Sequence, residues 1–326
     1  MLPAVTATTA ARVPLAPTRV PTPVLFVGVA AFWGMNIVAM RVAGRYVPPL
    51  TTATARSLFG GAVLLLIARR TGADWPRGRT EWTGIAWIAL LMTGLSTACL
   101  FLAARNAPAG LVSIFSNTMP LFVALSAPIL LSENVTRRAA LGLGVGLCGT
   151  VIVAWRAIEG EIKVMGVVFG LLGALTAALG SVMYKRHSLP RLDRLMVVAV
   201  QLLLSSVLLG VMSIPDNRSH LTFPWQFFVS FVYLSLLGLA LSFVFWSELL
   251  GRGSGLQASS VAYLSTVLGV IFGAILLGER LSWAVLLGGV IAIVGVALVQ
   301  SGPGARTTRA VRTGTAAAVE TAGAVE

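Results

Sequence analysis

The chain has 326 residues, of which 57% are hydrophobic and 11% are charged, and its formal net charge is +13. Soluble domains carry about 25% charged residues, so this composition excludes an ordinary soluble enzyme. The positive charge does not indicate nucleic-acid binding, because the Lys and Arg residues are scattered in small groups between apolar stretches.

Ten apolar stretches follow one another along the chain, and only the second contains a charge, Arg56. They lie at residues 20–40, 50–68, 82–104, 106–132, 139–155, 164–184, 195–215, 221–247, 253–278 and 281–305. A helix needs about 20 apolar residues to cross the hydrocarbon core, and runs of this length satisfy their backbone there as helices. The sequence therefore predicts an all-α integral membrane protein with ten transmembrane helices.

The two ends of the chain lack such stretches and are predicted to be tails. Residues 1–22 contain several prolines, and residues 302–326 are rich in Ala, Thr and Gly and are predicted to be disordered. The predicted loops and tails on the side of the two ends carry 16 Lys and Arg residues, and the other side carries 8. By the positive-inside rule, both ends are expected in the cytoplasm, with the helices in the cell membrane.

A weak internal repeat becomes visible when the sequence is shifted by 146 residues. Residues 120–153 then align with residues 266–299, and the eight identities include Glu133 with Glu279. The shift places the fourth and fifth predicted helices on the ninth and tenth, so the repeat unit has five helices. Because five is odd, the second copy is inverted in the membrane, an arrangement common in secondary transporters. The predicted repeats occupy residues 23–156 and 163–301.

Polar side chains inside the predicted helices are the candidate substrate-binding residues, because polar groups are costly in the membrane and are usually functional there. A plainer role is open to each, since Ser and Thr can bond to their own helix and Trp can fill the bundle. The candidates are Trp33, Asn36, Ser96, Thr97, Ser116, Asn117, Ser181, Tyr184, Ser242, Trp246, Tyr263 and Ser265. Pro120 is predicted to kink the fourth helix and to act as a hinge.

Two ionisable residues are candidates for ion coupling or for an interfacial charge. Glu248, at the end of the eighth predicted helix, could carry a proton or could instead pair with Arg252 at the interface. Arg56 could extend to the outer membrane surface or could bind an anionic substrate. The sequence contains no nucleotide-binding P-loop and no metal-binding or catalytic motif, so no enzyme activity, metal or cofactor is predicted.

Several motifs resemble those of the drug/metabolite transporter superfamily, EamA type. They are WGMN at residues 33–36, PP at 48–49, PAG at 108–110, SNTMP at 116–120, LLSE at 130–133, AYLS at 262–265 and LLGERLS at 276–282. The resemblance covers about residues 24–300 and implies two inverted five-helix repeats around a central cavity that opens alternately to each side. It also implies gradient-driven transport, most often export, of amino acids, other metabolites or toxic compounds. One departure is Thr266, where such proteins usually have proline.

The sequence thus predicts a secondary transporter of small organic metabolites, with export favoured, acting as a monomer or homodimer in the bilayer. A cavity lined by hydroxyl, amide and aromatic groups with few charges suits neutral, zwitterionic or amphipathic solutes. The alternatives are an uncoupled exchanger or facilitator and, in a different class, a membrane scaffold or sensor that transports nothing.

Overall fold

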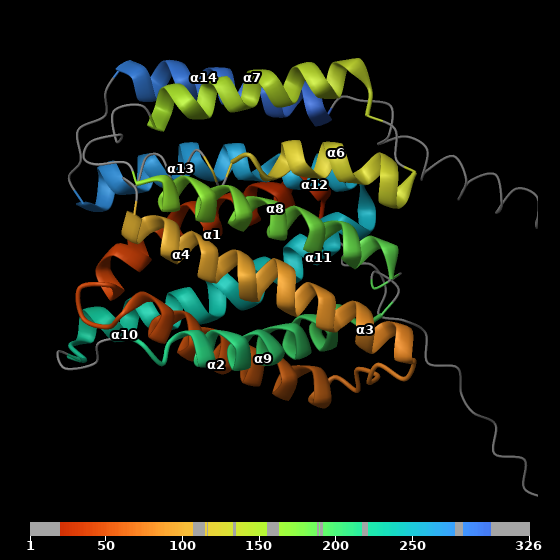
Figure 1. Ribbon diagram of the computed structural model, residues 1–326, viewed down its shortest axis with the longest axis vertical. Helices are drawn as coiled ribbons and strands as arrows, with labels where there is room; N and C mark the ends of the chain where they lie inside the picture. Colours follow the sequence, from red (N-terminus) through yellow and green to blue (C-terminus); the bar gives the residue numbers. More distant parts are fainter. Residues whose placement is uncertain are drawn as a thin grey trace, which may run out of the picture.

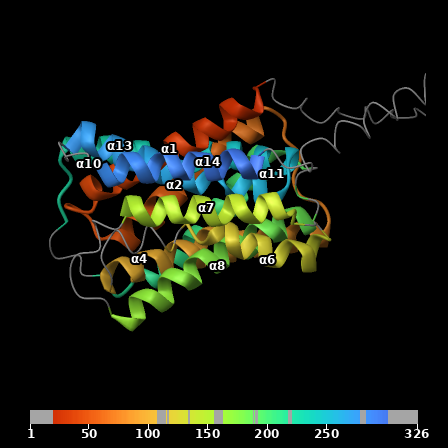
Figure 2. The ribbon, with the colours of Figure 1, turned by 90° about the horizontal axis from the view of Figure 1, so that it is seen from above.

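The structure is a computed structural model, and it describes residues 20–106, 115, 117–132, 135–154, 163–187, 189, 192–216, 221–277 and 283–300. Every regular element in these ranges is helical. Figure 1 shows the helices side by side with their axes roughly aligned, and Figure 2 shows the same bundle from above. The prediction of an all-α chain agrees with this part of the structure.

The first half of the chain forms seven labelled helical segments. They are α1 (Thr22–Ala43), α2 (Pro49–Arg70), α3 (Arg79–Ile88), the π-helical η1 (Ala89–Leu95), α4 (Ser96–Asn106), α6 (Met119–Leu131) and α7 (Arg137–Ala154). Proline lies in the first turn of α1, α2 and α6. This position needs no backbone N–H donor and favours the fixed φ of proline, so these residues help to define where the helices begin.

The second half forms eight segments. They are α8 (Val164–Arg186), α9 (Arg194–Met212), α10 (Trp225–Val232), the π-helical η4 (Tyr233–Leu241), α11 (Ser242–Arg252), α12 (Gly255–Ser259), α13 (Val261–Leu277) and α14 (Trp283–Gln300). The side chain of Asp193 accepts a hydrogen bond from the backbone N–H of Met196 at 3.1 Å and so caps the start of α9.

Seven helical stretches among the described residues are long and apolar enough to cross a membrane. They begin with α1, α2, α3, α8, α9, α10 and α12, and the third and sixth continue through a π-helical segment. The apolar parts of α6 and α14 are shorter, at Met119–Leu131 and Leu287–Val299. Each of the ten predicted ranges contains helix, but the number of ten membrane crossings stays a prediction.

Helices from the two halves of the chain pack against one another throughout the bundle. Figure 1 shows α7 beside α14 at one edge and α2 beside α9 at the other, and both pairs are in contact. Between these edges α1 packs on α13 and α11, while α8 packs on α6 and α4. The largest buried apolar cluster connects these middle helices to α9 and includes Met119, Tyr184, Val197 and Trp246.

The contact between α7 and α14 depends on glycine. A Cβ at Gly149 would lie 2.6 Å from the carbonyl oxygen of Gly288, and one at Gly142 would lie 2.9 Å from that of Gly295. These distances are too short for a side chain, so the two backbones meet directly, as small residues allow in membrane helices. Gly142 and Gly288 are 146 residues apart, and so are Gly149 and Gly295.

Two long helices contain a π-helical segment near their middle. In η1 and η4 the backbone bonds run from i to i+5, which is rare and often marks a functional site. The segments end at Leu95 and Leu241, again 146 residues apart, and each is followed by a buried serine, Ser96 or Ser242. Hydropathy does not distinguish a π-helix from an α-helix, so the sequence predicted a continuous helix in both places.

The predicted kink at Pro120 takes a different form in the structure. Helix α6 begins at Met119, so Pro120 lies in its first turn and removes no hydrogen bond from the helix interior. Asn117 and Thr118 form a turn directly before it. The interruption therefore lies ahead of the proline, and the proline inside α6 is Pro128. A hinge role for Pro120 stays a prediction.

Candidate functional site

Four of the predicted binding residues are joined by contacts near Gly238 of η4, and two of them bond to its carbonyl oxygen. Asn36 Nδ2 donates to the backbone oxygen of Gly238 at 2.8 Å, and Ser242 Oγ donates to the same oxygen at 2.8 Å. Trp33 Nε1 donates to Ser242 Oγ at 3.2 Å, and the Trp33 and Trp246 rings have centroids 5.1 Å apart. We call Trp33, Asn36, Ser242 and Trp246 the tryptophan cluster.

Glycine at position 238 makes this arrangement possible. A Cβ at that position would overlap with the side-chain oxygen of Asn36, so any other residue would push the amide away from η4. The cluster thus joins α1 of the first half to η4 and α11 of the second half. Its aromatic surface extends to Phe243, whose ring lies 6.3 Å from that of Trp33.

Two polar atoms of the tryptophan cluster are buried without a hydrogen-bond partner among the described residues. They are Asn36 Oδ1, an acceptor, and Trp246 Nε1, a donor. Leaving such a group unsatisfied costs about 1–3 kcal/mol. Asn36 Oδ1 lies against Gly238, whereas Trp246 Nε1 is an unpaired donor on the aromatic surface of the cluster.

The amide of Asn117 also bridges the two halves. Its Nδ2 donates to Thr266 Oγ1 at 2.7 Å, and the Thr266 hydroxyl in turn donates to the backbone oxygen of Ala262 at 3.2 Å. All three residues are buried. Thr266, the departure from the usual proline, thus supplies the acceptor that connects the start of α6 to α13.

Other predicted binding residues have partners inside their own helices or in the neighbouring helix. Ser181 donates to the backbone oxygen of Ala177, and Ser265 donates to that of Ala262. Hydrogen bonds of this kind, to the residue's own helix, were the alternative to substrate binding. Tyr263 donates to the backbone oxygen of Leu143 at 3.2 Å, so its hydroxyl joins α13 to α7. For these three residues, a role in substrate binding stays a prediction.

Of the remaining predicted residues, three lie in described helices but are not part of the tryptophan cluster, and one is not among the described residues. Ser96 and Thr97 lie at the start of α4, directly after η1. Tyr184 is buried on α8 beside Ser247. Ser116 is outside the described residues.

One buried polar contact was missed by the sequence prediction. Gln201 Nε2 donates to Thr93 Oγ1 at 3.2 Å and so connects α9 to η1. Both side chains are buried. The available signal was an amide in the middle of a charge-free run, the same signal that singled out Asn36.

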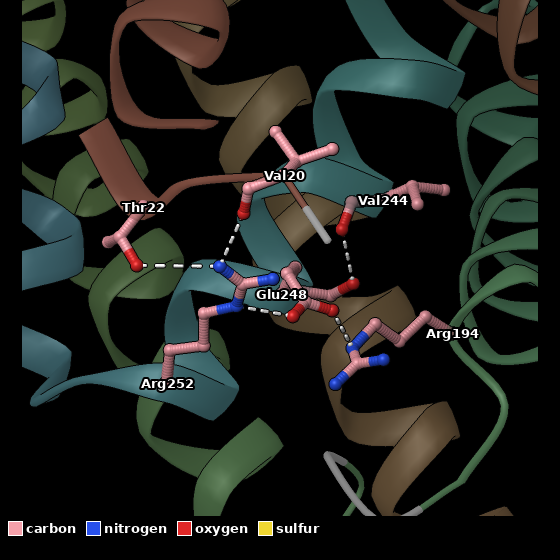
Figure 3. Close-up of polar contacts among 7 residues, drawn as sticks. Val20, Thr22, Arg194, Val244, Glu248 and Arg252 are labelled. Atoms are coloured by element: carbon pink, nitrogen blue, oxygen red, sulfur yellow. Dashed lines mark hydrogen bonds and ion pairs between the residues drawn. The ribbon is translucent and has the colours of Figure 1, made fainter. Parts of the chain in front are cut away.

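Glu248 lies between two arginines at one end of the bundle (Figure 3). Its side chain is 2% exposed; Arg252 Nε donates to Oε1, and Arg194 Nε lies 2.7 Å from Oε2. The Arg194 N–H is not aligned for a hydrogen bond, so this second contact is an ion pair. Figure 3 shows both arginines pointing toward the carboxylate, from α9 and α11. We call Arg194, Glu248 and Arg252 the Glu248 cluster.

Arg252 also connects this cluster to the beginning of α1. Its Nη1 donates to the backbone oxygen of Val20 at 2.7 Å and to Thr22 Oγ1 at 3.4 Å. Pairing with Arg252 was one of the two roles considered for Glu248, and the structure contains this pair. Arg194 forms a second ion pair with the same carboxylate. Both carboxylate oxygens are occupied by a positive charge.

Arg56 is buried on α2 and is 7% exposed. The side chain is therefore packed inside the bundle, and both roles considered for it stay predictions. Within the described ranges no group of three or more His, Cys, Asp or Glu gathers in a way that could hold a metal ion.

Comparison with known proteins places these features in a family context. A family model described as the EamA-like transporter family matches the chain twice, over residues 21–155 and 164–301. The chain is 27% identical over 286 residues to the uncharacterized transporter YvbV of Bacillus subtilis, covering 86% of this chain and 92% of that protein. It is 28% identical over 281 residues to a Salmonella typhimurium protein named a probable amino-acid metabolite efflux pump, covering 82% and 91%.

A solved crystal structure has the same fold. It superimposes with a TM-score of 0.72 over 85% of this chain and 95% of its own length, at 20% sequence identity. The two sequences are too different for this likeness to say more than that the helices are arranged in the same way.

Proposed function

The chain belongs to the EamA-like transporter family, and from that membership we propose that it is a secondary transporter that exports small organic metabolites. The proposed solutes are of the amino-acid type, since the Salmonella typhimurium relative is named a probable amino-acid metabolite efflux pump. Transport proceeds by alternating access, driven by gradients rather than by ATP.

The tryptophan cluster is the observation that carries this proposal. It combines aromatic surface with a buried acceptor, Asn36 Oδ1, and a buried donor, Trp246 Nε1, that lack partners among the described residues. It joins α1 to η4 and α11, at the interface between the two matched ranges. Transporters built from two repeats bind their solutes at such an interface.

We further propose that the two halves are inverted repeats related by a pseudo-twofold axis near the α7–α14 contact. Two features repeat with the offset of 146 residues: the sequence identities, which include the glycines of α7 and α14, and the ends of η1 and η4. The approach of Gly142 to Gly295 is matched by the approach of Gly288 to Gly149. Reciprocal contacts of this kind are what a twofold axis generates.

The direction of the protein in the membrane follows from the distribution of charge. Of the 24 Lys and Arg residues, 16 fall on the side of the two tails. These 16 include Arg194 and Arg252 of the Glu248 cluster. We place this side in the cytoplasm. The Glu248 cluster then lies at the cytoplasmic end of the bundle, where Arg252 holds the start of α1 against α11.

Counterflow in proteoliposomes tests the proposed function. A panel of labelled amino acids and cationic dyes would be offered to the purified protein, with and without a pH gradient. Saturable flux that accelerates with the gradient supports coupled export, and saturable exchange indifferent to pH supports the uncoupled exchanger. The occupied oxygens of Glu248 favour that second candidate, because no other buried acid in a membrane helix is available among the described residues. No flux with the panel or with a cell metabolite extract contradicts transport and leaves the scaffold alternative.

Substitution of Asn36 or Asn117 by Ala is expected to lower flux by roughly 3–10-fold, the loss of one neutral hydrogen bond. The fold should survive, because Gly238 keeps its bond from Ser242 and Thr266 keeps its bond to Ala262. Counterflow and the amount of folded protein in the membrane are measured together.

The matched control is Asn106→Ala, whose amide donates only to Leu102 in its own helix among the bonds described here. Normal flux in both Asn36→Ala and Asn117→Ala would contradict the assignment of the site. Equal losses in all three variants would show that the effect is not specific to the interface between the halves.

A further inference from the structure

Arg56 is a buried cation without a partner among the described residues. It lies on α2, seven residues after Pro49, or about 10 Å along the helix. The side chain is 7% exposed, its Nε has no hydrogen-bond partner, and no other described residue forms an ion pair or hydrogen bond with it. This differs from the Glu248 cluster, where each arginine contacts a carboxylate.

Thr52 lies one helical turn before Arg56 on the same face of α2. It is 6% exposed, and its hydroxyl also has no partner in the described part of the chain. Neighbouring positions on α2 contact other helices: Ala53 packs with Ala98 of α4, and Gly60 lies against the backbone of Ser235 in η4. Thr52 and Arg56 therefore lie in the interior of the bundle.

A buried guanidinium without a charged partner is costly, because burial removes its hydration, and no described residue returns the lost energy. Asp216, which follows α9, lies against the start of α2, and its Oδ2 accepts hydrogen bonds from the backbone N–H and hydroxyl of Thr51, both at 3.0 Å. No ion pair between Asp216 and Arg56 is present among the described residues. A ligand that brings its own negative charge would complete the site. One guanidinium beside one hydroxyl matches a single carboxylate, which accepts paired N–H donors from arginine.

We propose that Arg56 and Thr52 bind the carboxylate of the transported solute. The inference rests on the proposed function and narrows it to solutes with a carboxylate, including zwitterionic amino acids. The side chains of α2 then discriminate acids from their neutral analogues.

Paired probes that differ only at the carboxylate test this site in the purified full-length protein. The pairs are benzoate with benzamide, and L-leucine with L-leucinamide, at concentrations up to tens of millimolar. Protection against thermal unfolding is expected for the carboxylate member of each pair in the wild type. Arg56→Met should weaken that protection by about tenfold to a hundredfold in apparent affinity, Arg56→Lys should weaken it less, and Thr52→Val should also weaken it.

The stability of the unliganded variants separates a binding role from a structural one. Because Met removes an unpaired buried charge, Arg56→Met should melt at the same temperature as the wild type or higher. Arg45→Met is the matched control, since Arg45 is exposed in the loop after α1. The proposal is overturned if Arg56→Met lowers the melting temperature strongly while Arg45→Met does not. It is also overturned if the wild type does not prefer the carboxylates, or if Arg56→Met keeps the preference.

Two further arms separate this proposal from neighbouring ones. Chloride that protects as well as benzoate would show a site for inorganic anions and would overturn the assignment to the solute. Counterflow of leucine and leucinamide at equal rates would refute the carboxylate site while transport stands. If carboxylates bind in a way that depends on Arg56 but no flux is observed, the carboxylate site is supported and the proposed transport function is refuted.

Discussion

Replacing Glu248 by Gln is expected to destabilise the protein by about 3–5 kcal/mol, because the change leaves two partly buried arginines facing an uncharged amide. The side chain of Glu248 is 2% exposed, and those of Arg194 and Arg252 are 21% and 22% exposed. Gln keeps the shape of the side chain, so the loss reports on charge rather than on packing. Thermal unfolding of the purified protein in detergent measures the effect.

The exposed pair Asp74–Arg77 provides the control. Its side chains are 63% and 82% exposed, and their atoms lie 2.8 Å apart. An exposed pair contributes about 0–1 kcal/mol, so Asp74→Asn should leave the melting temperature almost unchanged. If Glu248→Gln is as stable as Asp74→Asn and its flux no longer responds to a pH gradient, Glu248 carries a proton and is not a structural anchor.

The Glu248 cluster also bears on how the bundle opens. Arg252 contacts the carboxylate within the second half and the backbone of Val20 at the start of the first. Any movement that separates α1 from α11 at this end must break the bonds from Arg252 to Val20 and Thr22, whereas the pairs of Glu248 can persist. In the proposed alternating-access cycle, we therefore expect the cluster to move as a unit with the second half.

The sequence predicted the helices well because a long charge-free run in a membrane has few other conformations. It predicted the π-helical segments poorly, since the shift from i+4 to i+5 bonding leaves hydropathy unchanged. The repeat explains where they occur: the ends of η1 and η4 have the offset already visible in the glutamates and glycines. Local sequence thus indicates where a membrane helix lies, and the internal repeat indicates that η1 and η4 occupy corresponding positions in the two halves.

The candidate site was predictable in part. Trp33, Asn36, Ser242 and Trp246 stood out as polar or aromatic side chains in apolar runs, and the structure brings them together. Nothing in the sequence indicated that Asn36 and Ser242 share the carbonyl oxygen of Gly238, because that depends on the crossing of α1 and η4.

Partners were harder to predict than residues. Arg194 was counted as a loop charge that orients the protein, but the structure places it on the carboxylate of Glu248. Thr266 was noted as a departure from proline, but its role as acceptor for Asn117 needed the packing of α6 near α13. Distances between segments far apart in the chain are what single-sequence patterns do not encode.

Replacing Gly295 by Ala is expected to destabilise the protein by roughly 1–3 kcal/mol, because the new methyl group would overlap with backbone atoms of α7. A Cβ at Gly295 would lie 2.7 Å from the carbonyl oxygen of Gly142 and closer still to the backbone nitrogen of Gly146. Backbone atoms cannot move aside as a flexible side chain can, so α14 must shift away from α7. Thermal unfolding in detergent measures the loss.

Gly144 on α7 supplies the control, because a Cβ there would have no atom within 4 Å. Gly144→Ala should be neutral or should stabilise by up to about 1 kcal/mol through helix propensity. Gly149 is the repeat partner of Gly295, and its Cβ would overlap with α14 in the same way. Similar losses for Gly149→Ala and Gly295→Ala are therefore expected if a pseudo-twofold axis relates the halves. If Gly295→Ala lowers the stability and Gly149→Ala does not, the two reciprocal contacts between α7 and α14 do not contribute equally to stability. That result would contradict the expected symmetry.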